Sequence, residues 1–266
     1  MEYYLNMLLG FLKQASLGEW LVLVAGFPLI LYSIVMCFAF WWKSRPIQGP
    51  NRWYLYLMLA YLLGFIWLWM VQAHIFENHP FFCFIPINFL LWVGPVLFQF
   101  AKSKLYANFR FKGNDLKHFL IPLAHFSFYG FAFLLPEQQK LGLYNQEYHD
   151  LYKVYETASF GLLMFLYCYF AYRFVKHEHW SMSTQTPRAE IIKILWLKRF
   201  LKLFFIASWV HLFYGLFSIA DAFFLKWSIK HNYLEFLNMF VIMVCMGWLG
   251  FHAVLMKALP KTEVNV

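Results

Sequence analysis

Polar and ionisable side chains lie within or at the ends of several long apolar segments, and these residues are where chemistry would be expected. They are Gln72, His74, Asn88, Glu156, Asp221 and Asn238. Placing such groups in an apolar environment is costly, so each is a functional candidate by default. All six lie near the same end of their segments and could line a polar mouth for a small ligand. The alternative is that each is simply solvated at the segment end.

Two histidines lie deeper in apolar segments. His211 has Tyr214 and Ser218 on the same helical face, at i+3 and i+7. His125 lies one heptad after His118. Two histidines on different helices could bind haem or relay protons, whereas a neutral histidine hydrogen-bonded to a neighbouring helix is the simpler interpretation. The candidate ligand-binding residues are therefore Asn88, Glu156, Asp221, Asn238, His211 and Tyr214.

Two short clusters contain metal-ligating residue types. The first comprises His74, Glu77 and His79, and the second comprises His177 and His179. Neither has further ligands at a fixed spacing, so we expect no metal site. The sequence also lacks the HExxH, GxSxG and phosphate-loop patterns, and we expect neither catalysis nor a cofactor.

The elements that must position these residues are apolar segments. The chain is 62% hydrophobic and 13% charged, whereas a soluble domain carries about 25% charged residues. Seven segments approach the roughly 20 residues that a transmembrane helix needs. They are Leu21–Phe40, Trp53–Val71, Phe81–Ala101, Phe119–Leu135, Ala158–Phe174, Phe200–Phe224 and Leu234–Leu255. The sequence therefore predicts an all-α polytopic membrane protein with seven transmembrane helices.

The basic residues predict the orientation of these helices. If the N-terminus is outside, the inner loops 43–52, 102–117 and 173–202, together with the C-terminal tail, hold 17 of the 22 Lys and Arg residues. Because Lys and Arg resist translocation, we expect the N-terminus outside and the C-terminus inside. The candidate residues for docking a partner on the inner surface are Lys104, Arg110, Lys112, Lys117, Arg188 and Lys193. The net charge of +9 belongs to these loops, and the absence of a nucleic-acid-binding pattern excludes direct contact with DNA or RNA.

Three parts of the chain follow from this topology. Residues 1–18 are expected to lie at the membrane interface, residues 19–257 to form the transmembrane domain, and residues 258–266 to form a short cytoplasmic tail.

Within the domain, Thr186 and Pro187 predict the N-cap and first turn of a helix that continues into the sixth segment. Pro122 cannot donate to the carbonyl of His118, which leaves that carbonyl free and bends the helix. The outer loop Pro136–Glu156 is polar and Tyr-rich, which suits an interfacial cap.

Several motifs resemble a bacterial group. GPVLFQFAKS at Gly94–Ser103, the pair Phe109 and Phe111, and DLKHFLIP at Asp115–Pro122 are similar to the seven-helix membrane sensor modules of Bacteroidetes AraC-type transcriptional regulators. Leu195–Lys198 and Trp248–Phe251 add to the likeness. In that family a DNA-binding domain follows the seventh helix, but here only 11 residues follow Leu255.

This resemblance implies a multi-pass protein of the bacterial inner (cytoplasmic) membrane that senses or relays a signal. We expect a small or lipidic ligand to bind near the outer leaflet. Membrane lipid and a separate cytoplasmic protein are the expected partners. Two alternatives remain open: a small-molecule or lipid transporter, and a structural subunit of a larger membrane assembly.

Overall fold

The computed structural model describes residues 17–44, 49–73, 75–106, 108–145, 147–180, 187–225 and 232–258. All regular secondary structure within these ranges is helical, which confirms the all-α prediction. The predicted interfacial segment lies outside the described residues except for its last two positions, where the first helix begins. The predicted tail lies outside them after Ala258.

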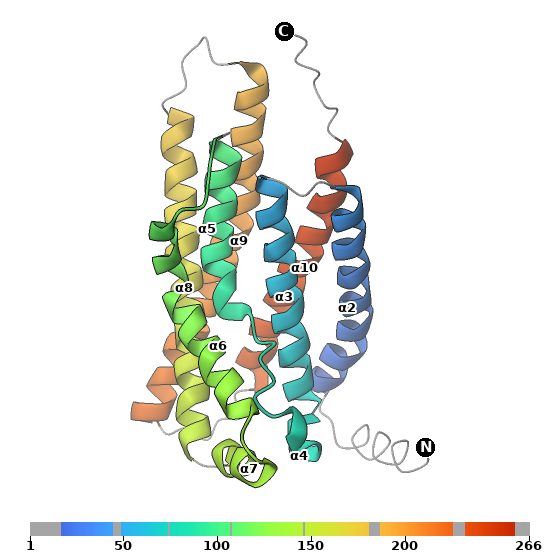
Figure 1. Ribbon diagram of the computed structural model, residues 1–266, viewed down its shortest axis with the longest axis vertical. Coiled ribbons are helices and arrows are strands. Elements are labelled where there is room, and N and C mark those ends of the chain that lie inside the picture. Colours follow the sequence, from blue (N-terminus) through green and yellow to red (C-terminus); the bar gives the residue numbers. More distant parts are fainter. Residues whose placement is uncertain are drawn as a thin grey trace.

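Long helices run side by side along the molecule and alternate in direction (Figure 1). They are α2 (Leu17–Lys43), α3 (Pro50–Gln72), α5 (Leu90–Leu105), α6 (Leu120–Phe133), α8 (Glu147–Trp180), α9 (Arg188–Ala220) and α10 (Asn232–Ala258). Shorter elements connect or extend them: α4 (Ile75–Asn78), η1 (Pro80–Phe82), η2 (Gly113–Phe119), α7 (Glu137–Asn145) and η3 (Asp221–Leu225). In Figure 1, α4 and α7 cover the lower end of the bundle, whereas α5, α8 and α10 end at the upper end.

Among the described residues, four helices are long and apolar enough to cross a membrane. The qualifying stretches are Val24–Lys43, Pro50–Gln72, Val154–Trp180 and Glu190–Phe224. α10 contains a shorter apolar stretch, Leu237–Ala253. α5 and α6 have 16 and 14 residues, which correspond to about 24 and 21 Å. These helices are compatible with a membrane protein.

The outer surface of the bundle is apolar. On α2, exposed large apolar side chains recur every three or four residues, at Val24, Phe27, Leu31, Val35, Phe38 and Trp42. α9 has the same pattern at Ile206, Trp209, Phe213 and Leu216. A soluble monomer rarely exposes apolar stripes of this extent. These stripes are compatible with contact with lipid.

An aromatic core lies between α3, α5, α9 and α10. Its largest fully buried side chains include Tyr54, Tyr61, Phe100, Phe200 and Phe204. Tyr54 OH donates a hydrogen bond of 2.5 Å to the carbonyl oxygen of Leu249. This bond joins α3 to α10 and satisfies a phenol that is otherwise surrounded by carbon.

Two glycines allow α8 and α9 to approach closely. A Cβ atom on Gly161 would lie 2.4 Å from the carbonyl oxygen of His211, and one on Gly215 would lie 2.9 Å from Cα of Ala158. Small residues at such crossings let membrane helices pack backbone to backbone. The crossing places His211 of α9 directly beside α8.

Several boundaries differ from the sequence prediction. The fifth predicted segment, Ala158–Phe174, is part of the longer α8, which begins at Glu147, so most of the predicted outer loop Pro136–Glu156 is helical. α5 begins at Leu90 rather than Phe81, because Pro86 lies inside the apolar run and a helix cannot continue through a residue that has no N–H group to donate. Residues 80–89 instead form η1 and turns, with Phe84 at a φ of 60°. At α9, Pro187 is the N-cap rather than the first helical residue, and Thr186 lies outside the described residues. The predicted continuous helix into the sixth segment is confirmed.

Candidate functional site

A small cavity of about 50 Å³, with a mainly apolar wall and a few polar groups, lies where α3, α5, α8, α9 and α10 meet. Glu156 and Thr157 of α8, Tyr214 of α9 and Asn238 of α10 supply its polar lining. Trp67, Leu68, Val71, Leu90, Leu91, Phe160 and Met239 complete the wall. A water needs about 10–15 Å³ of such space, so the cavity can hold a few waters or a ligand of a few heavy atoms.

Glu156 is the centre of a buried hydrogen-bond network. Its side chain accepts a hydrogen bond from Nδ2 of Asn88 at Oε1 and one of 3.1 Å from the Tyr129 hydroxyl at Oε2. Glu156 is 8% exposed and Asn88 is 3% exposed. Buried polar groups are stable only when hydrogen-bonded, and here donors from two other segments hold the carboxylate at the cavity wall.

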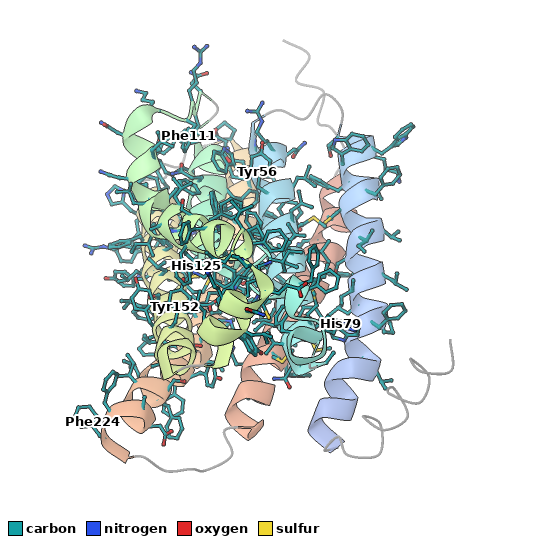
Figure 2. The ribbon with its side chains drawn as sticks, turned by 60° about the horizontal axis from the view of Figure 1, so that its bottom comes forward. Tyr56, His79, Phe111, His125, Tyr152 and Phe224 are labelled. Carbon is teal, nitrogen blue, oxygen red and sulfur yellow. The ribbon has the colours of Figure 1, made fainter. Side chains whose placement is uncertain are left out.

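His125 connects this carboxylate to a second tyrosine. Its Nε2 lies 3.8 Å from Oε1 of Glu156, and its Nδ1 lies 2.8 Å from the Tyr152 hydroxyl. Figure 2 shows His125 and Tyr152 close together, on α6 and α8. The hydrogen bond to a neighbouring helix confirms the simpler interpretation of this histidine.

His211 holds Asn238 from the other side of the cavity. Nδ1 of His211 lies 2.5 Å from Oδ1 of Asn238, and both residues are buried. The bond joins α9 to α10, again as the simpler interpretation predicts. Because the amide oxygen of Asn238 is engaged by His211, its Nδ2 is the group left to interact with a cavity occupant.

Five of the six predicted ligand-binding residues therefore belong to one site. Glu156, Tyr214 and Asn238 line the cavity, and Asn88 and His211 are bonded to two of them. Asp221 is the sixth; it is buried at the point where α9 passes into the π-helical turn η3, and it does not line the cavity. Its role as a ligand-binding residue remains a prediction.

Other groups of the site were not among these candidates. Tyr129 follows His125 by four residues, and Glu156 follows Tyr152 by four, so each pair shares a helical face. This spacing was the signal that could have identified both tyrosines. Trp67 was not among the candidates either. Its Nε1 is buried at the cavity and has no hydrogen-bond partner among the described residues.

The two clusters of metal-ligating residue types are not assembled into a metal site in the described part of the chain. No group of three His, Cys, Asp or Glu residues there is arranged to hold an ion. His74 of the first cluster lies outside the described residues, and His177 and His179 of the second lie in the last turn of α8.

The predicted docking residues gather at the opposite end of the bundle. Arg110, Lys112, Lys117 and Arg188 are exposed. Lys104 is partly buried, with Nζ 5.8 Å from the centre of the Trp196 ring on α9. Burial lowers the pKa of Lys104, and the positive charge of Lys193 lowers it further. Lys104 and Trp196 therefore join α5 to α9, in addition to any docking role of Lys104.

The loop that carries three of these six cations, Arg110, Lys112 and Lys117, is itself fixed. We call residues 106–119, which join α5 to α6, the basic loop. Nζ of Lys102 lies 2.8 Å from Oδ1 of Asp115, and the backbone N–H of Lys112 donates to Oδ2 over 2.9 Å. Burial raises the pKa of Asp115, but these two bonds reverse the effect and hold the pKa below its usual range.

A second pair of bonds fixes the end of the basic loop. The Tyr167 hydroxyl of α8 donates to the carbonyl oxygen of His118 over 3.2 Å and lies 3.1 Å from Nδ1 of the same residue. The carbonyl is the one that Pro122 leaves without a helical donor, so the predicted free acceptor is satisfied by a neighbouring helix. The motif residues of this region are thus structural.

Comparison with known proteins finds no match to this chain among protein-family models, curated proteins or solved structures. The functional conclusion therefore depends on the arrangement of the residues described above.

Proposed function

We propose that this chain is a seven-helix membrane sensor of the bacterial inner membrane. It binds a small polar ligand in the Glu156 cavity and transmits the signal to a protein partner at its basic end. The observation that carries the proposal is the convergence of Glu156, Tyr214 and Asn238, from three different helices, on one cavity. A site assembled from separate helices can change their relative positions when it is filled.

Seven membrane crossings with the N-terminus outside are part of this proposal. The alternating directions of α2, α3, α5, α6, α8, α9 and α10 support the count (Figure 1). The exposed cations of the basic loop and of α9 lie toward the end where α5 and α8 finish, which supports a cytoplasmic location for that end. The Glu156 cavity then lies toward the outer leaflet.

The route for the signal follows the helices themselves. α8 and α9 both line the cavity and are packed backbone to backbone through Gly161 and Gly215. Farther along, α9 carries Trp196, whose ring lies under Nζ of Lys104 of α5. A ligand that binds one arrangement of α8, α9 and α10 more tightly than another shifts the population at the basic end by its difference in affinity.

The direct test measures binding of small polar probes by the purified full chain in lipid nanodiscs. The probes are methylammonium, ethanolamine, glycine and acetate, each followed by thermal unfolding. We expect one of these chemical classes to stabilise the wild-type protein, with an apparent affinity at least about tenfold weaker in Asn238→Leu. Gln138→Ala, an exposed change on α7, is the control and should bind as the wild type does.

The same variants decide between sensing and transport in cells. A deletion strain complemented with wild type or Asn238→Leu is grown with and without the bound probe, and its transcripts are compared. A response to the probe that is lost in Asn238→Leu supports sensing. Accumulation of the probe by proteoliposomes supports a transporter instead. If no probe binds and both strains have the same transcripts, the ligand-sensing proposal is wrong.

A further inference from the structure

A second, larger hollow lies on the side of the bundle formed by α3, α5 and α6. This groove has a volume of about 510 Å³ and shares no lining residue with the Glu156 cavity. Its walls include Trp53, Tyr56 and Leu63 of α3, Trp92 of α5, and Phe111 and Phe119 of the basic loop. None of its lining residues is charged. The volume falls within the usual range for a site that holds one drug-sized molecule.

The basic loop forms one wall of the groove and is held in place by hydrogen bonds and an ion pair. Asp115 is fixed by Lys102 and by the backbone of Lys112, and His118 is fixed by Tyr167. The residues between and beside these anchors, Phe111, Leu116 and Phe119, line the groove. The Trp53 and Phe111 rings lie 5.4 Å apart, and the Trp92 and Phe119 rings lie 5.6 Å apart.

Cations flank the apolar residues of this wall. Arg110 and Lys112 are the two neighbours of Phe111, and Lys117 follows Leu116; all three cations are exposed. The acidic residue of the loop, Asp115, is already engaged by Lys102. The wall therefore combines hydrocarbon on its inner side with exposed positive charge around it. Figure 2 shows Phe111 and Tyr56 on neighbouring elements at this end, away from His125 and Tyr152.

We infer that the groove binds an anionic phospholipid, with an acyl chain between α3, α5 and α6 and the phosphate held by Arg110, Lys112 and Lys117. An extended peptide would bring backbone N–H and C=O groups into a space that has almost no partners for them, at a cost of several kcal/mol in an apolar medium. An acyl chain brings none. Basic residues beside a membrane attract anionic lipid headgroups. The inference depends on membrane embedding, but not on the Glu156 cavity or on sensing.

The test is native mass spectrometry of the full chain released from nanodiscs that contain phosphatidylglycerol and phosphatidylcholine with identical acyl chains. We expect the wild type to retain one phosphatidylglycerol with about a tenfold preference over phosphatidylcholine, because each cation near the surface adds to the attraction. The variant R110Q/K112Q/K117Q should lose this preference. R188Q/R199Q/K202Q, which removes three exposed cations of α9, is the matched control and should keep it.

A second pair of variants tests the position of the acyl chain. Leu123 lines the groove and is 40% exposed, whereas Leu120, on the same helix, is 64% exposed and does not line it. Leu123→Trp should fill the groove and reduce lipid retention about tenfold, while Leu120→Trp should not. Because both sites are exposed, neither change prevents folding, and thermal unfolding of each variant checks this.

Three results overturn the inference. One is a wild-type protein that retains no lipid or shows no preference for phosphatidylglycerol. Another is an unchanged preference in R110Q/K112Q/K117Q, or unchanged retention in Leu123→Trp. The third is a dimer that dissociates in Leu123→Trp but not in Leu120→Trp, which would make a second copy of the chain the occupant of the groove.

Discussion

At the scale of single residues, Glu156 determines the character of the buried site. Its carboxylate is removed from water, and its two oxygens are each met by a donor, Asn88 at one and Tyr129 at the other. His125 lies beside the first oxygen, close enough to form an ion pair whenever it is protonated. A carboxylate held in this way keeps its position when the cavity changes occupants, which is what a specific binding site requires.

The Tyr129 hydroxyl should therefore contribute measurably to stability. Tyr129→Phe removes one donor from the carboxylate, and the loss of a buried hydrogen-bond partner costs about 1–3 kcal/mol. Unfolding of the protein by SDS in mixed micelles measures the change. In a double-mutant cycle with Glu156→Gln, we expect a coupling free energy of about 0.5–3 kcal/mol, as for residues in one network. Additive effects of the two changes would show that the hydroxyl does not act through Glu156.

Asp115 gives the basic loop a dependence on pH with a defined sign. Its pKa is lower in the folded protein than in the unfolded chain. Its contribution to stability is therefore present above the unfolded value of about 3.9 and is lost as the pH falls through the folded value. Hydrogen exchange at the Lys112 amide, which donates to Asp115, should show protection that decreases over this acidic range.

Asp115→Asn should produce the same loss at neutral pH. The amide keeps the shape of the side chain but loses its charge, so the bond to Lys102 weakens and the Lys112 amide exchanges faster at pH 7. Glu190→Gln, an exposed change at the start of α9, is the control and should leave this amide unaffected. Unchanged protection in Asp115→Asn would mean that other contacts hold the loop.

At the scale of elements, the crossing of α8 and α9 is the most sensitive to substitution. Gly161→Ala places a methyl group against the backbone of His211, which cannot move without displacing α9. We expect a destabilisation of about 1–3 kcal/mol, typical of overpacking, and a weaker His211–Asn238 bond. Thermal unfolding of the purified protein measures the first effect.

A matched glycine serves as the control for this prediction. Gly247 lies within α10, where a Cβ atom would have no neighbour within 4 Å. Gly247→Ala should be neutral or stabilising by up to about 1 kcal/mol, because alanine favours the helix. Equal unfolding temperatures for the Gly161 and Gly247 variants would contradict the close crossing.

The elements also show what sequence reasoning can and cannot find. Helices such as α3 and α9 were predictable because a long apolar run is a strong local signal. The start of α5 was not, because the residues from Phe81 to Phe89 are apolar apart from Asn88, although Pro86 among them prevents a continuous helix. An apolar run predicts that a segment lies in a membrane, but the position of a proline within the run determines where its helix can begin.

The candidate site was also predictable only in part, because some of its residues carry a local sequence signal and others do not. The cost of burial identified Glu156 and Asn238 without any knowledge of their neighbours. Tyr129 and Tyr152 were missed because tyrosine near a helix end is equally typical of a membrane interface. Asp221 differs from the others because η3 is a π-helical turn, and a change of helical period alters the face on which a side chain lies.

At the scale of the whole molecule, cysteine labelling can establish the orientation. The four native cysteines are free and buried, so they should give little background with a membrane-impermeant maleimide. We expect Gln138→Cys, on α7, to react in spheroplasts, and Asn114→Cys, in the basic loop, to react only after permeabilisation. Both positions are exposed. The opposite pattern would reverse the orientation, and labelling of both in spheroplasts would contradict the span count.

The shortness of α6 has a consequence for the lipid around it. Its 14 residues extend about 21 Å, whereas a typical hydrocarbon core is about 30 Å thick. In the proposed topology the bilayer must thin beside this helix, at a cost of a fraction of a kcal/mol for each Å of hydrophobic mismatch. Longer acyl chains therefore work against α6 in the same way as a destabilising mutation. Membrane thickness becomes a variable to which this protein responds.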